Sequence, residues 1–390
     1  MLSDDELTAW LRLATTPGIG RAVARQLLAA FGSPERVLAA EESTLLSLVG
    51  PDVVHALKRR DPRDDARVDT TRRWLDAATP GAPRDLVVLG DPRYPALLLE
   101  TADPPLLLFT LGRTELLSTP GIAIVGSRSA TPQGMENARE FAFFLSEHKL
   151  TIVSGLAMGI DGAAHEGGLA GPGSTVAFVG TGLDRVYPRP HAALMRRIAE
   201  QGLVASEYPL GTHSQPHNFP RRNRLIAGIT RGTLVVEAAI ESGSLITARM
   251  ALEAGREVFA IPGSIHSPQS RGCHRLIQEG AKLVETGADV LHELRLASPD
   301  VALRASLAPT RPSLFATAPA VLAAPPDGAE SAGPDAALRA ALGHDPVTFD
   351  VLSARTGMPF DQLAARLLEL ELAGVVERLP GGLLQRRGRA

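Results

Sequence analysis

Hydrophobic and polar positions follow different periods along the chain, and the changes divide it into four regions. Residues 1–80 carry apolar positions at helical spacing and are expected to form a small all-α domain. Residues 81–297 alternate short apolar runs with helical patterns, which predicts an α/β domain whose sheet is mostly parallel. Residues 298–334 are rich in Pro, Ala and Ser with little periodicity and are expected to form a flexible linker. Residues 335–390 combine helical patterns with a hairpin pattern.

Two successive strand-to-helix turns, after the apolar runs 122–125 and 151–155, organise the α/β region. The run 122–125 has no polar face, as expected of a strand buried on both sides. Parallel strands end at one edge of a sheet, so the two turns should form a crevice in which backbone N–H groups converge on an anion. This pattern predicts an extended Rossmann-like domain with a phosphate site, and Arg128 at its lip. The turn residues expected to contact the phosphate are Gly126, Ser127, Arg128, Ser154 and Gly155.

The most basic patch of the α/β region surrounds the aromatic residue Phe219. An aromatic ring can stack on any base while guanidinium groups hold the backbone, so this composition is typical of a single-stranded nucleic acid site. For the arginines alone, a solvated helix face is the commoner explanation. A third turn of small residues, at 242–248, is a further possible phosphate nest. The DNA-binding residues expected in these segments are Arg189, His217, Phe219, Arg221, Arg222, Asn223, Arg224, Gly243 and Ser244.

The first 80 residues contain a turn, 17–20, that resembles the hairpin of helix-hairpin-helix modules, as in helix-hairpin-helix/SAM-like domains. Arg21 and Arg25 lie one helical turn apart directly after it. Such a turn can bring backbone amides to a DNA phosphate. Small helical modules also serve as protein contacts, and the sequence leaves both roles open.

The last region has the layout of a winged helix: a helix, a helix-turn-helix with Gly357 at the turn, and a hairpin. Its expected recognition helix carries three acidic residues against Arg366 alone: Asp361, Glu369 and Glu371. A phosphate-lined groove would repel this helix. We therefore interpret the winged helix as a protein-contact or regulatory module.

Composition limits the possible partners and the compartment. The formal net charge of the 390 residues is −3, so a polyanion must be bound by a local basic patch. A single cysteine, Cys273, excludes intramolecular disulfides and thiolate zinc clusters and is compatible with a reducing cytosol. The sequence has no signal segment and no long apolar stretch, which predicts a cytoplasmic protein with no membrane partner.

Catalytic constellations are few. Asp161 and His165 lie at i, i+4 on one helix face, but no third metal ligand occurs at a readable spacing. A buried Asp161–His165 hydrogen bond that fixes the loop is the favoured interpretation. The adjacent Cys273 and His274 do not form a nucleophile–base pair by adjacency alone, and no P-loop motif occurs. We expect no catalytic residue, no metal and no cofactor.

Seven motifs between about 120 and 285 resemble, in order, those of the DNA-processing protein A family (DprA, also called Smf): IVGSR, SGLAMGIDGAAH, GTGLDRVYP, SEYPLGT, FPRRNRLIAG, VVEAAIESGSLITA and AIPGSIHSPQSRGCHRLI. The helical amino-terminal module and the winged helix also match the longer members of the family. The resemblance implies a non-enzymatic protein that binds single-stranded DNA, and duplex DNA more weakly. It also implies that the protein protects incoming DNA, loads RecA onto it during natural transformation, and forms homodimers through the Rossmann-like domain.

By motif position, the DNA-contacting arginine of the family falls on Arg128 and its stacking aromatic on Phe219. Its R-N-R element falls on Arg222, Asn223 and Arg224. The chain departs from the family at Pro216, where some members have a basic residue, and at His274, where Asn is common.

A second hypothesis is an enzyme, a nucleotide phosphoribohydrolase of the lysine-decarboxylase-like type. Such enzymes resemble one another in a P-G-G-x-G-T-x-x-E loop, and this chain has Gly232, Thr233 and Glu237 in a similar segment. The paired glycines of that loop are missing. The first hypothesis is therefore favoured.

Overall fold

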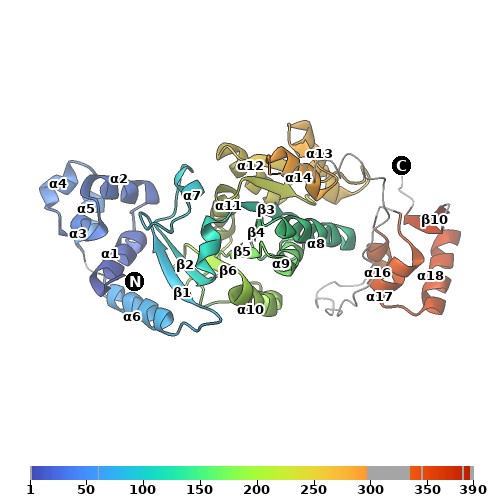
Figure 1. Cartoon of the computed structure of the whole chain (residues 1–390), viewed down its shortest axis with the longest axis horizontal. Helices are drawn as coiled ribbons and strands as arrows, with labels where there is room; N and C mark the ends of the chain where they lie inside the picture. The colour runs from blue at the N-terminus through green and yellow to red at the C-terminus, as the bar shows by residue number, and fades with distance from the viewer. Residues whose placement is uncertain (1, 60, 297–333, 344–345, 380–381, 387–390) are drawn as a thin grey trace.

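The computed structural model has three parts, which follow one another along the long axis of the molecule in Figure 1: a group of helices, a central α/β domain and a smaller carboxyl-terminal unit. It describes residues 2–59, 61–296, 334–343, 346–379 and 382–386. The predicted linker at 298–334 lies, except for its last residue, outside the described residues.

The central domain is built on a nine-stranded sheet with the order β1-β2-β6-β5-β4-β3-β7-β8-β9. The strands from β6 to β9 in this order pair in parallel, whereas β2 pairs antiparallel with both β1 and β6. The predicted mostly parallel sheet is thus confirmed. The strands are β1 (Arg84–Val88), β2 (Leu107–Gly112), β3 (Gly121–Val125), β4 (Thr151–Ser154), β5 (Thr175–Phe178), β6 (Leu203–Ser206), β7 (Gly232–Val235), β8 (Glu257–Ala260) and β9 (Lys282–Leu283).

Helices cover both faces of the sheet because its inner strands are apolar on both sides. In β3, Ile122 and Ile124 belong to one core, and Ala123 and Val125 belong to the core on the opposite face. The first face is covered by α8 (Pro132–Glu147), α9 (Ile160–Ala170), α10 (Ala192–Gln201) and α14 (Gly287–Glu293). The second is covered by α7 (Ala96–Leu99), α11 (Asn218–Gly228), α12 (Gly243–Glu253) and α13 (Arg271–Gln278).

In the amino-terminal part, the described residues form six helices: α1 (Asp4–Thr15), α2 (Arg21–Phe31), α3 (Pro34–Ala39), α4 (Glu42–Leu46), α5 (Pro51–Lys58) and α6 (Arg63–Asp76). The predicted hairpin joins α1 to α2, and Gly18 adopts a φ of 83°, which favours glycine. The core of these helices is continuous with that of β1 and β2. Trp74 of α6 meets Phe109 of β2 edge-to-face, with ring centroids 6.0 Å apart.

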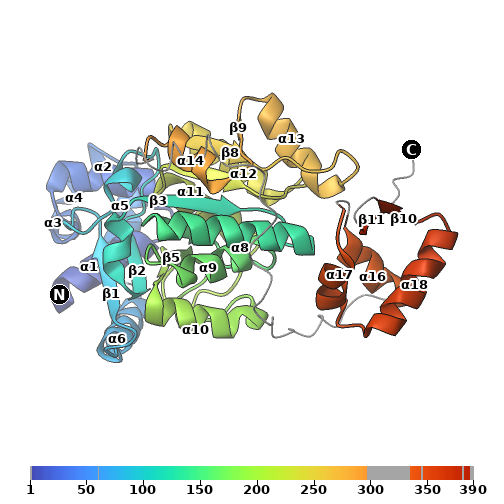
Figure 2. The same cartoon turned by 45° about the vertical axis from the view of Figure 1, so that its right-hand side comes forward.

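The carboxyl-terminal part is a winged helix, as predicted. It consists of α16 (Pro334–Leu342), α17 (Phe349–Thr356), α18 (Phe360–Leu372), β10 (Val376–Leu379) and β11 (Leu383–Arg386). Gly357 ends α17 with a φ of 66°, so a left-handed residue makes the turn of the helix-turn-helix. This unit has its own apolar core and lies at the opposite end of the molecule from the amino-terminal helices (Figures 1 and 2).

Candidate functional site

A crevice of about 490 Å³ opens beyond the carboxyl ends of β3 and β7. Its walls are the turn after β3, the segment around Ala157 and Asp161 after β4, the middle of α11 and the segment that leads into α12. Arg128, Asn223 and Glu241 are among the polar residues that line it. The crevice therefore lies where the open edge of a parallel sheet is expected to bind ligands.

The turn after β3 packs closely against Ile160 and Glu237, whereas Arg128 at its end points outward. A Cβ on Gly126 would lie 2.6 Å from Ile160 and 2.8 Å from the carbonyl oxygen of Glu237, so only glycine fits there. The buried Ser127 donates its N–H to the same carbonyl oxygen at 2.7 Å. Arg128 itself is exposed. The structure thus gives the predicted first turn and places its arginine at the mouth of the crevice.

The turn after β4 differs from the prediction, because its amides are used within the protein. Gly155 and Ala157 donate their N–H groups to Oδ2 of Asp161, at 3.1 and 3.3 Å. The Ser154 side chain is fully buried and donates to the carbonyl oxygen of Ile124 at 2.7 Å. An internal carboxylate therefore occupies the position of the expected phosphate. Ser154 and Gly155 do not line the crevice itself, although Gly155 lines a smaller cavity beside Phe219.

Asp161 and His165 do fix this loop, but not through the expected hydrogen bond to each other. His165 Nε2 accepts from the Leu156 N–H at 3.2 Å, and Nδ1 lies 2.7 Å from the Thr175 hydroxyl. Complete burial lowers the pKa of His165 to about 3, so the ring is neutral. Burial likewise raises the pKa of Asp161. The two side chains thus bind neighbouring amides of one loop separately, rather than each other.

Arg222 is buried, with 3 % of its surface exposed. Its Nη1 donates to the carbonyl oxygen of Gly155 at 2.6 Å and also to that of Phe178. Burial lowers the pKa of Arg222 to about 10, which still leaves the guanidinium charged at neutral pH. Arg222 therefore ties α11 to the ends of β4 and β5, and it also forms part of the lining of the crevice.

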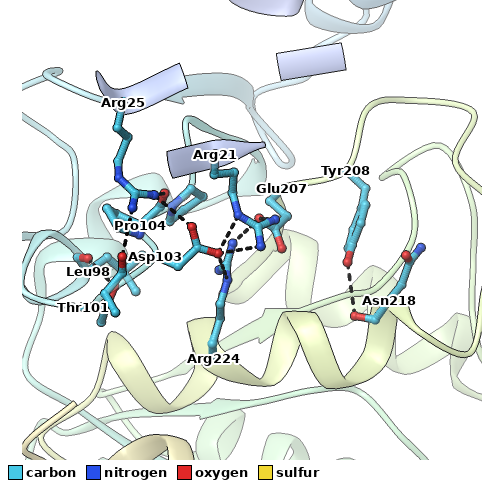
Figure 3. Close-up of polar contacts among 12 residues, drawn as sticks. Arg21, Arg25, Leu98, Thr101, Asp103, Pro104, Glu207, Tyr208, Asn218 and Arg224 are labelled. Atoms are coloured by element: carbon cyan, nitrogen blue, oxygen red, sulfur yellow. Dashed lines mark hydrogen bonds and ion pairs between the residues drawn. The ribbon is translucent and has the colours of Figure 1, made fainter. Parts of the chain in front are cut away.

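Arg224 points away from the crevice, into an ion-pair cluster (Figure 3). It binds Asp103 at 3.2 Å and Glu207 at 2.5 Å. Arg21 and Arg25, the residues after the predicted hairpin, reach the same Asp103 carboxylate at 2.5 and 2.8 Å. These hairpin arginines thus contact the α/β domain of their own chain.

An aromatic group adjoins the crevice on the side of Arg128. The guanidinium carbon of Arg128 lies 5.5 Å from the ring centroid of Phe219. The ring centroid of Tyr187 lies 5.2 Å from that of Phe219. These three side chains line a smaller cavity of about 50 Å³. Sequence reasoning did not single out Tyr187, although an aromatic next to Pro188 in a loop after a strand was a readable signal.

The remaining predicted residues fall into two groups. Arg189, His217, Arg221 and Gly243 are exposed, and Asn223 is half-buried where it lines the crevice. Ser244 also lines the crevice but is buried, and its N–H is donated to the Ser242 side chain at 3.3 Å. In the third turn, the N–H group of Ser244 is therefore bound by Ser242, the N-cap residue of α12.

Two side chains that could act in catalysis, those of Cys273 and Glu237, are buried or hydrogen-bonded within the protein. The Cys273 thiol is buried, which raises its pKa to about 12 and makes it a poor nucleophile at neutral pH. The Glu237 carboxylate accepts from the N–H and hydroxyl of Thr131, at 2.9 and 2.6 Å, and so anchors the start of α8. Among the residues that the structure describes, no three His, Cys, Asp or Glu side chains are placed to hold a metal. No described helix is long and apolar enough to cross a membrane.

Comparison with known families gives two matches. Residues 85–295 match the family described as DNA recombination-mediator protein A. Residues 322–382 match the DprA winged helix domain.

Individual relatives agree with these matches. Protein Smf of Escherichia coli is 42% identical over 324 residues, which cover 82% of this chain and 81% of that protein. The X-ray structure of DprA from Streptococcus pneumoniae superposes with a TM-score of 0.59 at 37% identity, over 75% of this chain and 98% of that one. A structure of DprA from Helicobacter pylori, described as showing its single-stranded DNA binding mode, gives a TM-score of 0.50 at 28% identity, over 54% and 95% of the two chains.

Proposed function

Since the chain belongs to the DNA recombination-mediator protein A family, we propose that it binds single-stranded DNA at the crevice and delivers the strand to RecA. The observation that carries this proposal is the position of Arg128. Its guanidinium is exposed at the mouth of a 490 Å³ crevice and beside an aromatic ring, and it has no carboxylate partner within the described residues. A cation of this kind is available to a phosphate.

The aromatic group explains why the ligand should be a single strand. Bases of a single strand can turn outward and stack on a ring, whereas those of a duplex are already stacked on one another. Exposed Arg221 and Arg189 add positive charge near the same aromatic residues. We expect binding that depends strongly on salt and weakly on base sequence, with duplex DNA bound less tightly.

The rest of the proposal follows from family membership. We propose that the chain protects incoming DNA during natural transformation, acts in the cytoplasm, and pairs with a second copy through the α/β domain. We also propose that it is not an enzyme. The engaged Glu237 carboxylate and the buried Cys273 thiol support this view, since neither is available to a substrate.

Arg128→Ala tests the DNA site. We expect weaker binding of a fluorescent oligothymidylate and a salt slope that falls by about 0.7, the value for one phosphate contact on a single strand. Fluorescence anisotropy at several salt concentrations measures both. Arg196→Ala is the matched control, because Arg196 is exposed on α10, on the other face of the sheet. An equal effect of the two variants, or an unchanged slope for Arg128→Ala, would place the site elsewhere.

A further inference from the structure

The outer face of α18, the recognition helix of the winged helix, is apolar and exposed. Leu368 is 53 % exposed and Leu372 is 82 % exposed, and the small Ala365 is exposed beside them. Each residue turns a helix by about 100°, so these three side chains lie within about 60° of one another around the axis. We call Ala365, Leu368 and Leu372 the outer stripe. Their i, i+3, i+7 spacing is that of a helix face that packs on another helix.

The outer stripe is separate from the face of α18 that builds the core of the winged helix. That core contains Leu363, Leu367 and Leu370, which are buried on the opposite side of the helix. In both views of the molecule α18 is the outermost helix, with α16 and α17 between it and the α/β domain (Figures 1 and 2). Apolar side chains on two opposite faces are typical of a helix that is covered on both, so the outer stripe indicates a partner.

Carboxylates border the outer stripe and define the charge of that partner. Asp361 and Glu369 are exposed, and the Glu369 side chain keeps 63 % of its surface although it pairs with Arg366 at 2.8 Å. The two acidic residues are eight positions apart, which is about 12 Å along the helix. They repel a phosphate backbone, whereas two Lys or Arg side chains spaced by about two helical turns would meet both.

The same charges disfavour a second copy of this chain as the occupant. A symmetric pair of α18 helices that buried Leu368 and Leu372 would place Glu369 beside an acidic residue of the other copy. That residue is Glu369 if the two helices are antiparallel and Glu371 if they are parallel. Like charges placed together at an interface are unfavourable.

We propose that the outer stripe is a docking site for a basic amphipathic helix of another protein. Apolar side chains of that helix pack on Leu368 and Leu372, and its Lys or Arg residues pair with Asp361 and Glu369. The small Ala365 leaves room for a large side chain of the partner. This inference goes beyond the proposed single-strand binding, because α18 contributes no residue to the described lining of the crevice.

Two synthetic helical peptides of equal length test the charge requirement by fluorescence anisotropy with the full-length protein. The basic probe carries Leu at i, i+3, i+4 and i+7 and Lys at the other positions, and the acidic probe carries Glu in place of Lys. We expect the wild-type chain to bind the basic probe at least about tenfold more tightly than the acidic probe, and the double variant Asp361→Lys, Glu369→Lys to show the reverse order. No preference in the wild-type chain, or an unchanged preference in the double variant, would overturn the proposal.

The double variant Leu368→Ser, Leu372→Ser tests the apolar requirement. Both side chains are exposed, so we expect an unchanged Tm, oligothymidylate binding within about twofold of the wild type, and an affinity for the basic probe that falls at least about tenfold. Leu46→Ser is the matched control, because Leu46 is 50 % exposed on α4, and it should bind the probe like the wild type. Equal affinities of the double variant and this control would refute the docking site. Sedimentation velocity should give the same mass for the wild type and the double variant, and a lower mass for the variant would assign the stripe to self-association instead.

Discussion

Arg222 and Arg224 show how two arginines of one motif acquire different roles. They lie two positions apart in α11, so the helix directs them to opposite sides. Arg222 is a buried part of the crevice wall and donates to carbonyl oxygens at the ends of two strands, whereas Arg224 joins Asp103 and Glu207. Both guanidinium groups are thus committed within the protein, and a loss of DNA binding in a variant of either one can reflect a loss of structure.

Arg222→Ala should mainly destabilise the fold. It removes the hydrogen bonds to the carbonyl oxygens of Gly155 and Phe178 and leaves Asp161 without its nearby positive charge. Removal of one partner from a buried, hydrogen-bonded ion pair lowers the free energy of unfolding by about 3–5 kcal/mol. Urea denaturation followed by circular dichroism measures this change in the free energy of unfolding.

The matched control is Arg221→Ala, since Arg221 is the exposed neighbour on the same helix turn. Its free energy of unfolding should change by no more than about 0.5 kcal/mol. If Arg222→Ala proved as stable as Arg221→Ala, the structural role of Arg222 would be wrong.

The sequence identifies this motif but cannot assign its side chains to environments. Helical spacing predicts that positions 222 and 224 face different ways. Which one is buried depends on Gly155 and Asp103, which come from distant segments. The sequence does not single out Tyr187 for the same reason, since its ring is recognisable as part of the site only from its contact with Phe219.

Helices α2 and α11 are joined through the Asp103 carboxylate (Figure 3). Arg21 and Arg25 come from α2, and Arg224 comes from α11. Partial burial opposes ionisation of Asp103, but the hydrogen bonds from Arg21 and Arg25 prevail and lower its pKa to about 2. This cluster therefore fixes the hairpin side of the amino-terminal helices on the α/β domain.

Asp103→Asn should lower the free energy of unfolding by about 1–2 kcal/mol at neutral pH, a modest figure because the carboxylate is one-third exposed. A depressed pKa stabilises the fold above the unfolded-state value near 4, and this contribution disappears as the pH falls toward 2. The difference from wild type should thus be constant from pH 7 to 5 and shrink below pH 4. Urea titrations at each pH measure it.

Glu166→Gln controls for the loss of an ordinary surface charge, because Glu166 forms an exposed pair with Arg139. It should cost at most about 1 kcal/mol at pH 7. A wild-type advantage over Asp103→Asn that persisted undiminished at pH 3 would contradict the role assigned to the Asp103 carboxylate.

Element types were more predictable than their directions. The apolar runs at 86–90 and 106–112 predict strands; β1 overlaps the first run, at 84–88, and β2 lies within the second. Their antiparallel pairing is not readable from the runs, because direction depends on which neighbour each strand finds. The inner strands follow the prediction closely since burial on both faces leaves an unbroken apolar signature.

The winged helix contacts the α/β domain near the start of α8. Arg355 of α17 lies 3.0 Å from Gln133 and 3.2 Å from Glu136. A cavity of only about 40 Å³ lies between the two parts at this point. The contact adjoins the turn after β3, yet the winged helix contributes no residue to the described lining of the 490 Å³ crevice.

Removal of residues 297–390 should therefore leave single-strand binding nearly unchanged. The crevice, Arg128, Tyr187 and Phe219 all belong to the part that remains, and the acidic residues of α18 offer a phosphate little attraction. Anisotropy with oligothymidylate should give an affinity within about threefold of the full chain and the same salt slope.

Arg355→Ala, which loosens the contact without a deletion, should agree with the truncation. A loss as large as that of Arg128→Ala in the truncated protein alone would show that the winged helix itself holds DNA. The same loss in both variants would show instead that its contact with α8 shapes the crevice.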